Sequence, residues 1–126
     1  MRYLMFVCAD PEAEHYVPEE DNINEWVDEM DRRNVRILGH RLKDVEDATT
    51  VRRRKGQVLI TDGPFTETKE WITGFDIIEC ADFNEAVDIA ASHPMARFGR
   101  IEVRPFRPED PGESRTASDA PMSCES

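Results

Sequence analysis

The residues best suited to chemistry lie in one short segment, residues 61–70, which reads TDGPFTETKE. The segment has neither the alternating pattern of a strand nor the period of a helix, so we expect a loop without regular secondary structure. Gly63 can adopt backbone angles that are unfavourable for other residues. Pro64 fixes its own φ and favours an extended conformation for the residue before it. The loop is therefore expected to present the carboxylate of Asp62 at the end of a strand, as a candidate catalytic base or ligand anchor.

Each charged residue of this loop has two interpretations. Asp62 either acts on a ligand or only accepts hydrogen bonds from the backbone N–H groups of its own turn. Glu67, Lys69 and Glu70 either bind a polar ligand, with Lys69 supplying the positive charge, or form ion pairs within the loop. The sequence does not decide between the functional and the structural interpretation.

Two candidate ligand-binding residues lie outside the loop. Alternation along a strand places Arg52 on one face with Thr50 and Arg54, from which it would reach an anionic ligand or pair with the Asp62 loop. His93 precedes a proline at the expected C-terminus of a helix, where the dipole favours a cation, so a capping role is the alternative to ligand binding. The three histidines are isolated from one another and from suitable carboxylates, so the sequence predicts no metal site.

An enzyme built from these residues would work without a cofactor. Asp62 or a glutamate would serve as the base, and Lys69 or Arg52 would stabilise developing negative charge. The residue types do not specify a reaction. We therefore expect the protein to bind a small polar molecule beside the loop, and the sequence leaves open whether it also acts on that molecule.

Hydrophobic patterns predict the elements that must position these residues. Apolar or alternating runs predict strands, and apolar residues at i, i+3, i+4 and i+7 predict helices. Asn22 with Glu25, and Asp82 with Glu85, have the spacing of capping boxes. The expected strands cover residues 3–9, 35–38, 50–54, 57–61, 72–80 and 101–105, with Gly39 ending the second strand, and the expected helices begin after Asn22 and Asp82.

This order of elements is β-α-β, a β-hairpin, and β-α-β, which predicts an α+β, ferredoxin-like split βαβ fold with one extra hairpin. Such a sheet carries both helices on one face and leaves the other open. A second copy of the same sheet would cover the open face, so we expect a homodimer. Glu102 and Arg104 share one face of the last strand and are expected to contact the partner or to line the site.

The loop resembles a known family. The segment DGPFTETKE, together with Gly74-Phe75 and His93-Pro94, resembles the DGPF (DGPFAETKE) family of YCII-related proteins, and the likeness extends over roughly residues 2–106. The resemblance implies a dimeric α+β barrel but no established reaction. Shorter YCII-like proteins carry a His and an Asp near the first helix and second strand, but that helix here reads NINEWVDEMDRR and contains no histidine. Neither His15 nor His40 matches the motif position, so the pair is not transferred to this chain.

The resemblance also supplies an alternative function. Some relatives are joined to a sigma factor of the extracytoplasmic-function type, or are encoded next to one. The chain would then be a non-catalytic regulatory or interaction module with a sigma-factor link.

Composition disfavours several other classes of protein. The 126 residues include 16 Lys and Arg against 27 Asp and Glu, for a net charge of -11, which disfavours direct binding to nucleic acid. No apolar run is long enough for a membrane span or a signal peptide, so we expect a cytoplasmic protein. Residues 1–106 are expected to form the domain, and the polar, proline-containing residues 107–126 a disordered acidic tail.

Overall fold

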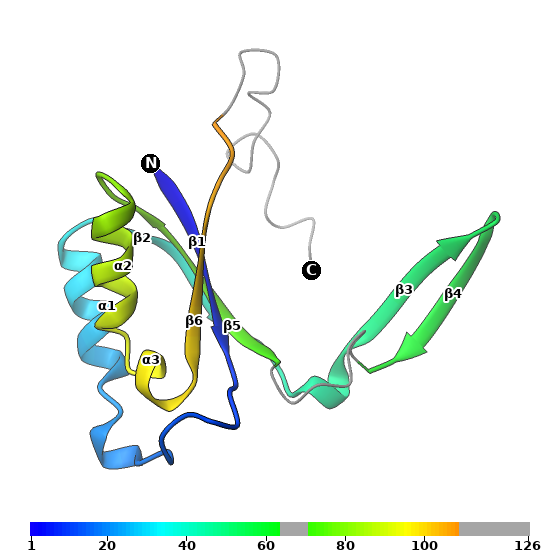
Figure 1. Cartoon of the computed structure of the whole chain (residues 1–126), viewed down its shortest axis with the longest axis horizontal. Coiled ribbons are helices and arrows are strands. Elements are labelled where there is room, and N and C mark those ends of the chain that lie inside the picture. Colours follow the sequence, from blue (N-terminus) through cyan, green and yellow to red (C-terminus); the bar gives the residue numbers. More distant parts are fainter. Residues whose placement is uncertain (64–70, 109–126) are drawn as a thin grey trace.

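The computed structural model describes residues 1–63 and 71–108 (Figure 1). The chain is an α+β protein. Its strands are β1 (Arg2–Cys8), β2 (Arg36–Arg41), β3 (Thr49–Arg54), β4 (Gln57–Asp62), β5 (Ile72–Glu79) and β6 (Arg100–Pro105). Its helices are α1 (Ile23–Arg32), α2 (Phe83–Ala91) and the short α3 (Met95–Phe98), with 3-10 turns at Pro18–Glu20 and Val45–Asp47.

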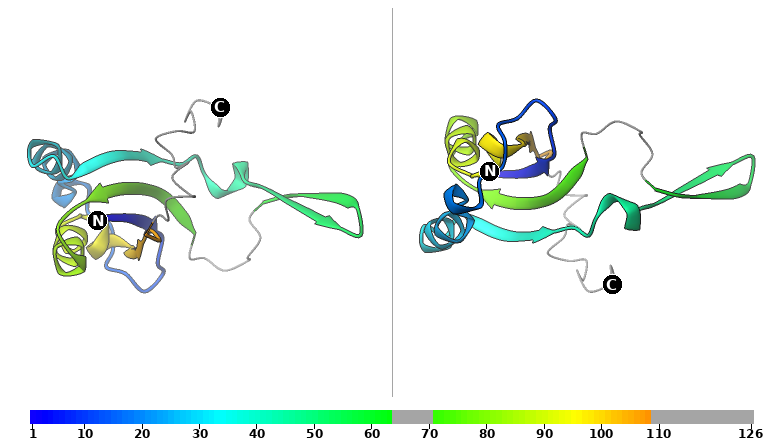
Figure 2. Two further views of the ribbon diagram at one scale, coloured as in Figure 1. Left: turned by 90° about the horizontal axis from the view of Figure 1, so that it is seen from above. Right: turned by 90° about the horizontal axis from the view of Figure 1, so that it is seen from below.

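Four of the strands form one antiparallel sheet in the order β2-β5-β1-β6. The two central strands, β1 and β5, have the most apolar sequences, because each is flanked by strands on both sides. The helices lie on one face of the sheet, and no helix of the described residues covers the other face (Figures 1 and 2). The predicted α+β class is confirmed, and this strand order is compatible with a ferredoxin-like fold.

The hydrophobic core fills the space between the sheet and the helices. Alternation along β1 sends Tyr3 and Met5 toward the helices and leaves Leu4 and Phe6 on the open face. Burying one such apolar side chain stabilises a fold by roughly 1.5–3 kcal/mol. The buried core residues are Tyr3, Met5, Trp26, Met30, Val35, Ile78, Ala86, Ile89 and Ala90.

The two long helices begin in different ways. The Asp82 carboxylate accepts a hydrogen bond from the Glu85 N–H at 2.9 Å, and Glu85 accepts one in return from the backbone N–H just before the cap at 2.7 Å. The predicted cap of α2 is therefore confirmed. The predicted capping box at Asn22 is wrong, because Asn22 makes no side-chain cap. Asp21 accepts the hydrogen bond of the Ile23 N–H instead, at 3.1 Å.

Strands β3 and β4 pair only with each other and form the predicted hairpin as a separate two-stranded sheet. Lys55 and Gly56 at its tip have positive φ angles of 53° and 79°, as tight two-residue hairpin turns require. The hairpin projects away from the body on the side of the open sheet face, opposite the helices (Figure 1).

The second strand was expected to end at Gly39, and this prediction is wrong. Strand β2 continues through Gly39 to Arg41, and Gly39 lies opposite Asp76 of β5. A Cβ atom at this position would overlap the side chains of Asp76 and Arg36. The glycine is therefore a site of close approach within a strand and does not mark a turn.

Two predicted segments lie largely outside the described residues. They are the loop after Gly63, which covers residues 64–70, and the tail, of which only residues 107 and 108 are described. Within the described part of the chain, no helix has the length and apolar character to cross a membrane.

Candidate functional site

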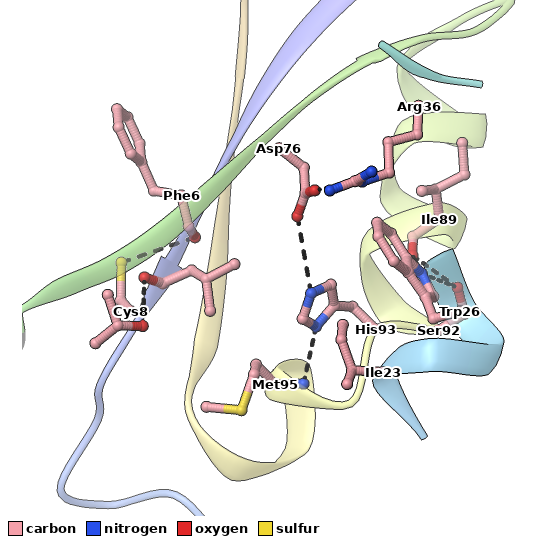
Figure 3. A network of polar contacts seen from close by, with 12 residues as sticks. Phe6, Cys8, Ile23, Trp26, Arg36, Asp76, Ile89, Ser92, His93 and Met95 are labelled. Carbon is pink, nitrogen blue, oxygen red and sulfur yellow. Dashed lines mark hydrogen bonds and ion pairs between the residues drawn. The ribbon is translucent and has the colours of Figure 1, made fainter. Parts of the chain in front are cut away.

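A buried polar cluster lies between the sheet and the helices. It consists of Arg36 from β2, Asp76 from β5 and His93 from the turn after α2 (Figure 3). Arg36 Nε donates to Asp76 Oδ1 at 2.9 Å, and His93 Nε2 lies 3.8 Å from Asp76 Oδ2. Asp76 and His93 are 6% and 4% exposed, and they are the only buried polar or charged residues in the described ranges.

Strand register creates this cluster. Asp76 occupies an inward position of β5, between Gly74 and the core residue Ile78. Gly39 lies opposite Asp76 on β2 and has no side chain, which leaves room for the Arg36 guanidinium. Arg36 and Asp76 were not predicted as site residues from the sequence. The available signal was an aspartate at an inward position of an otherwise apolar strand, a position that requires a charged partner.

His93 is neutral at pH 7. Burial lowers its pKa from 6.5 to about 4, the Asp21 carboxylate opposes this shift, and the charge of Arg36 adds to it. The Met95 N–H donates to His93 Nδ1 at 3.0 Å, so the single ring proton lies on Nε2 and faces Asp76. The expected cationic cap at the end of α2 is therefore wrong, and His93 instead caps the first turn of α3.

The cluster connects four elements. Burial raises the pKa of Asp76, and the hydrogen bond and charge of Arg36 oppose that rise. The Trp26 ring of α1 packs against His93 with centroids 4.6 Å apart, and Trp26 Nε1 donates to Ser92 Oγ at 3.0 Å (Figure 3). Since Nδ1 of His93 already accepts a backbone hydrogen bond, the ring offers no unoccupied basic nitrogen, and the cluster is suited to joining the helices to the sheet.

A groove of about 330 Å³ lies along α1, where this helix meets Ser92 at the end of α2. Trp26 takes part in this groove as well as in the contact with His93. The groove is lined by Asn22, Glu25, Trp26, Glu29, Met30, Arg33 and Ser92.

The open face of the sheet carries a second and more accessible group of residues. Cross-strand pairing aligns Leu38, Ile77 and Leu4 in one row, and His40, Phe75 and Phe6 in the next. All of these side chains are half-buried except His40, which is exposed. On the edge strand β6, the exposed residues Arg104 and Glu102 continue the two rows. The face is thus apolar in its centre, with a histidine on one edge and charged residues on the other.

The structure separates two of the predicted site residues. Asp62 ends β4, is exposed and lies opposite Thr49, whereas Arg52 lies opposite Leu59. Register therefore puts the two side chains on opposite faces of the hairpin, and they do not pair. The Arg52 guanidinium approaches the Thr61 hydroxyl at 3.5 Å, and its buried Nε has no hydrogen-bond partner among the described residues.

Gly63 is the last described residue of the expected loop, and its backbone continues the pairing of β3 and β4. Its N–H donates to the Ala48 carbonyl at 2.7 Å, its own carbonyl accepts from the Thr50 hydroxyl at 2.8 Å, and its φ is 96°. The positive φ explains the glycine, because L-residues rarely adopt it. Glu67, Lys69 and Glu70 lie outside the described residues. His93 is buried directly after α2, which lies on the opposite side of the sheet from the hairpin (Figure 1).

No group of three or more His, Cys, Asp or Glu side chains in residues 1–63 and 71–108 could hold a metal ion. The open face also brings no such set of ligands together.

The chain is similar to a known family and to a protein of another organism. The model of the YCII-related domain matches residues 1–110 of the chain. An uncharacterized protein of Rhizobium meliloti (strain 1021) is 43% identical over 75 residues, which cover 58% of this chain and 60% of the relative. The chain thus spans less than two thirds of that relative's length.

Proposed function

The chain belongs to the YCII-related family, and from this premise we propose that it is a homodimer whose open sheet faces meet and enclose a binding site for a small polar molecule. Each protomer would contribute one sheet to a dimeric α+β barrel. The site would lie beside the segment that follows Gly63, as the sequence predicts.

The observation that carries the proposal is the composition of the open face. Its central rows contain Leu4, Phe6, Phe75, Ile77 and Leu38, all on the side that no described helix covers. In a domain of this size an apolar sheet face of this kind requires a cover. A two-fold symmetric pair buries the same patch of both copies, so one sequence feature supplies both halves of the interface.

The polar residues at the edges of the open face favour a polar ligand. Twisted sheets that pack face to face diverge at their corners, which leaves space between them at the edges. His40 on one edge and Glu102 and Arg104 on the other would line that space. Asp62 and the loop residues Glu67, Lys69 and Glu70 are proposed to approach it from the hairpin base, with Arg52 as a further donor.

Binding is better supported than catalysis. Asp62 and Arg52 lie on opposite faces of the hairpin, so one protomer cannot use them together on one ligand group. His93 offers no unoccupied basic nitrogen, because Nδ1 accepts the Met95 N–H. We therefore propose a binding protein and assign no reaction to it.

Light scattering tests the assembly. The wild-type protein is expected to show twice the chain mass of 14.5 kDa. Phe6→Lys places a charge on the central strand β1 of the open face, where the partner would have to bury it, and should give monomers. Val87→Lys is the matched control, because Val87 is 43% exposed on α2, away from that face. A wild-type monomer at micromolar concentration, or a Phe6→Lys protein that still dimerises fully, would contradict the proposal.

A further inference from the structure

The β3–β4 hairpin has an exposed apolar face. Pairing places Val51 opposite Ile60 and Arg53 opposite Val58, and alternation puts these four side chains on the same face. Val51, Val58 and Ile60 are 63%, 51% and 68% exposed. Isolated two-stranded hairpins are marginally stable in water, and adjacent exposed apolar residues mark an interaction surface. The face therefore requires a partner.

The charge of the hairpin indicates the sign of the charge on that partner's surface. Residues 49–62 contain four basic residues and one acidic residue, whereas the rest of the chain contains 12 basic and 26 acidic residues. The hairpin is thus a basic segment on a strongly acidic protein, and it is attracted to acidic surfaces. A second copy of this chain presents such a surface.

The direction and length of the hairpin suit the same partner. It projects on the side of the open sheet face (Figure 1). Each of its strands has six residues, which span about 20 Å at about 3.3 Å per residue, whereas packed sheets lie about 10 Å apart. A copy docked on the open face would therefore lie within reach of the hairpin.

We propose that the hairpin is an arm that clasps a second copy of this chain, with the apolar face of Val51, Val58 and Ile60 packed against the partner and the basic side chains beside its carboxylates. The inference rests on the proposed function, since it needs a dimer formed through the open face. Two-fold symmetry gives each dimer two such arms, so the arms contribute to affinity in addition to the sheet contact.

Matched threonine variants test the arm, because threonine favours strands and should preserve the hairpin. The double variant Val51→Thr, Ile60→Thr removes apolar groups from the proposed contact face. Leu59→Thr is the control, since Leu59 lies between Val58 and Ile60 on the same strand but faces the opposite side. The dimer dissociation constant of each full-length protein is measured by light scattering over a dilution series. Hydrogen exchange of residues 49–62 is measured at protein concentrations above and below that dissociation constant.

The double variant is expected to weaken the dimer by at least about tenfold, equivalent to about 1.4 kcal/mol, with less than about a threefold change for Leu59→Thr. Hairpin amides should exchange more slowly in the dimer. If Phe6→Lys disrupts the dimer but the double variant does not, the arm is refuted and the sheet contact stands. If the wild-type protein is monomeric, both proposals fail. The arm is also refuted if the threonine double variant leaves the dimer dissociation constant unchanged while the double variant Arg53→Gln, Arg54→Gln abolishes binding to a DNA duplex. In that case the hairpin binds nucleic acid.

Discussion

Acidification is expected to destabilise this protein through His93. The side chain is 4% exposed, and burial lowers its pKa from 6.5 to about 4 in the folded state. In the unfolded chain the imidazole is solvated and binds a proton near its ordinary pKa of about 6.5. Between these two values the unfolded state binds more protons than the folded state. The stability present above the unfolded pKa is therefore lost as the pH falls through the folded pKa.

The magnitude follows from the shift. A decrease from 6.5 to about 4 corresponds to about 3 kcal/mol, at about 1.36 kcal/mol per pKa unit, and nearly all of it is lost between pH 7 and pH 4. Asp76 acts in the opposite direction, because its pKa is raised by burial. Its contribution is present at low pH and is lost as the pH rises through its folded pKa.

Urea unfolding at pH 7, 5.5 and 4 isolates the contribution of His93. His93→Asn retains an acceptor for the Met95 N–H but cannot take up a proton. Because Asp76 remains in both proteins, its own titration largely cancels when they are compared. The wild type should lose about 3 kcal/mol more unfolding free energy than His93→Asn between pH 7 and pH 4. His40→Asn, at an exposed histidine, should follow the wild type. Equal losses in the wild type and His93→Asn would refute the assignment of a buried, neutral imidazole.

Three further predictions concern stability. Gly39→Ala should lower the unfolding free energy by about 1–3 kcal/mol, measured in urea, because the new Cβ overlaps the Arg36–Asp76 pair; an unchanged value would show that the pair can shift freely. Trp26→Phe should cost about 1–2 kcal/mol by the same measurement, because Nε1 no longer donates to the Ile89 carbonyl and Ser92 Oγ; a loss below about 0.5 kcal/mol would contradict this role. Deleting residues 109–126 should change the melting temperature by less than about 2 °C, since that segment is polar and lacks an apolar period; a larger decrease would show that it packs on the domain.

Local patterns predicted the elements well because their causes are local. The continuous apolar run at β1, the Lys55-Gly56 turn and the Asp82 cap depend on residues within a few positions of one another. Strand alternation also placed Arg52 on the correct face of the hairpin. Each of these features is determined by backbone geometry that adjacent residues specify.

The buried cluster could not be predicted in the same way. Arg36, Asp76 and His93 come from two strands and a turn far apart in the sequence, and only the β2–β5 register and the packing of α2 bring them together. The predicted strand end at Gly39 is wrong because a glycine that terminates a strand and one that allows close approach look alike in a sequence. For the hairpin, the relation of Asp62 to Arg52 likewise required the register.

Native mass spectrometry of the freshly purified protein tests the proposed function most directly. We expect dimers of the 14.5 kDa chain that carry the additional mass of a bound small molecule. Arg104→Gln, on the rim of the open face, should keep the dimer but lose the added mass. Monomers, or wild-type dimers without any added mass, would contradict the proposed site.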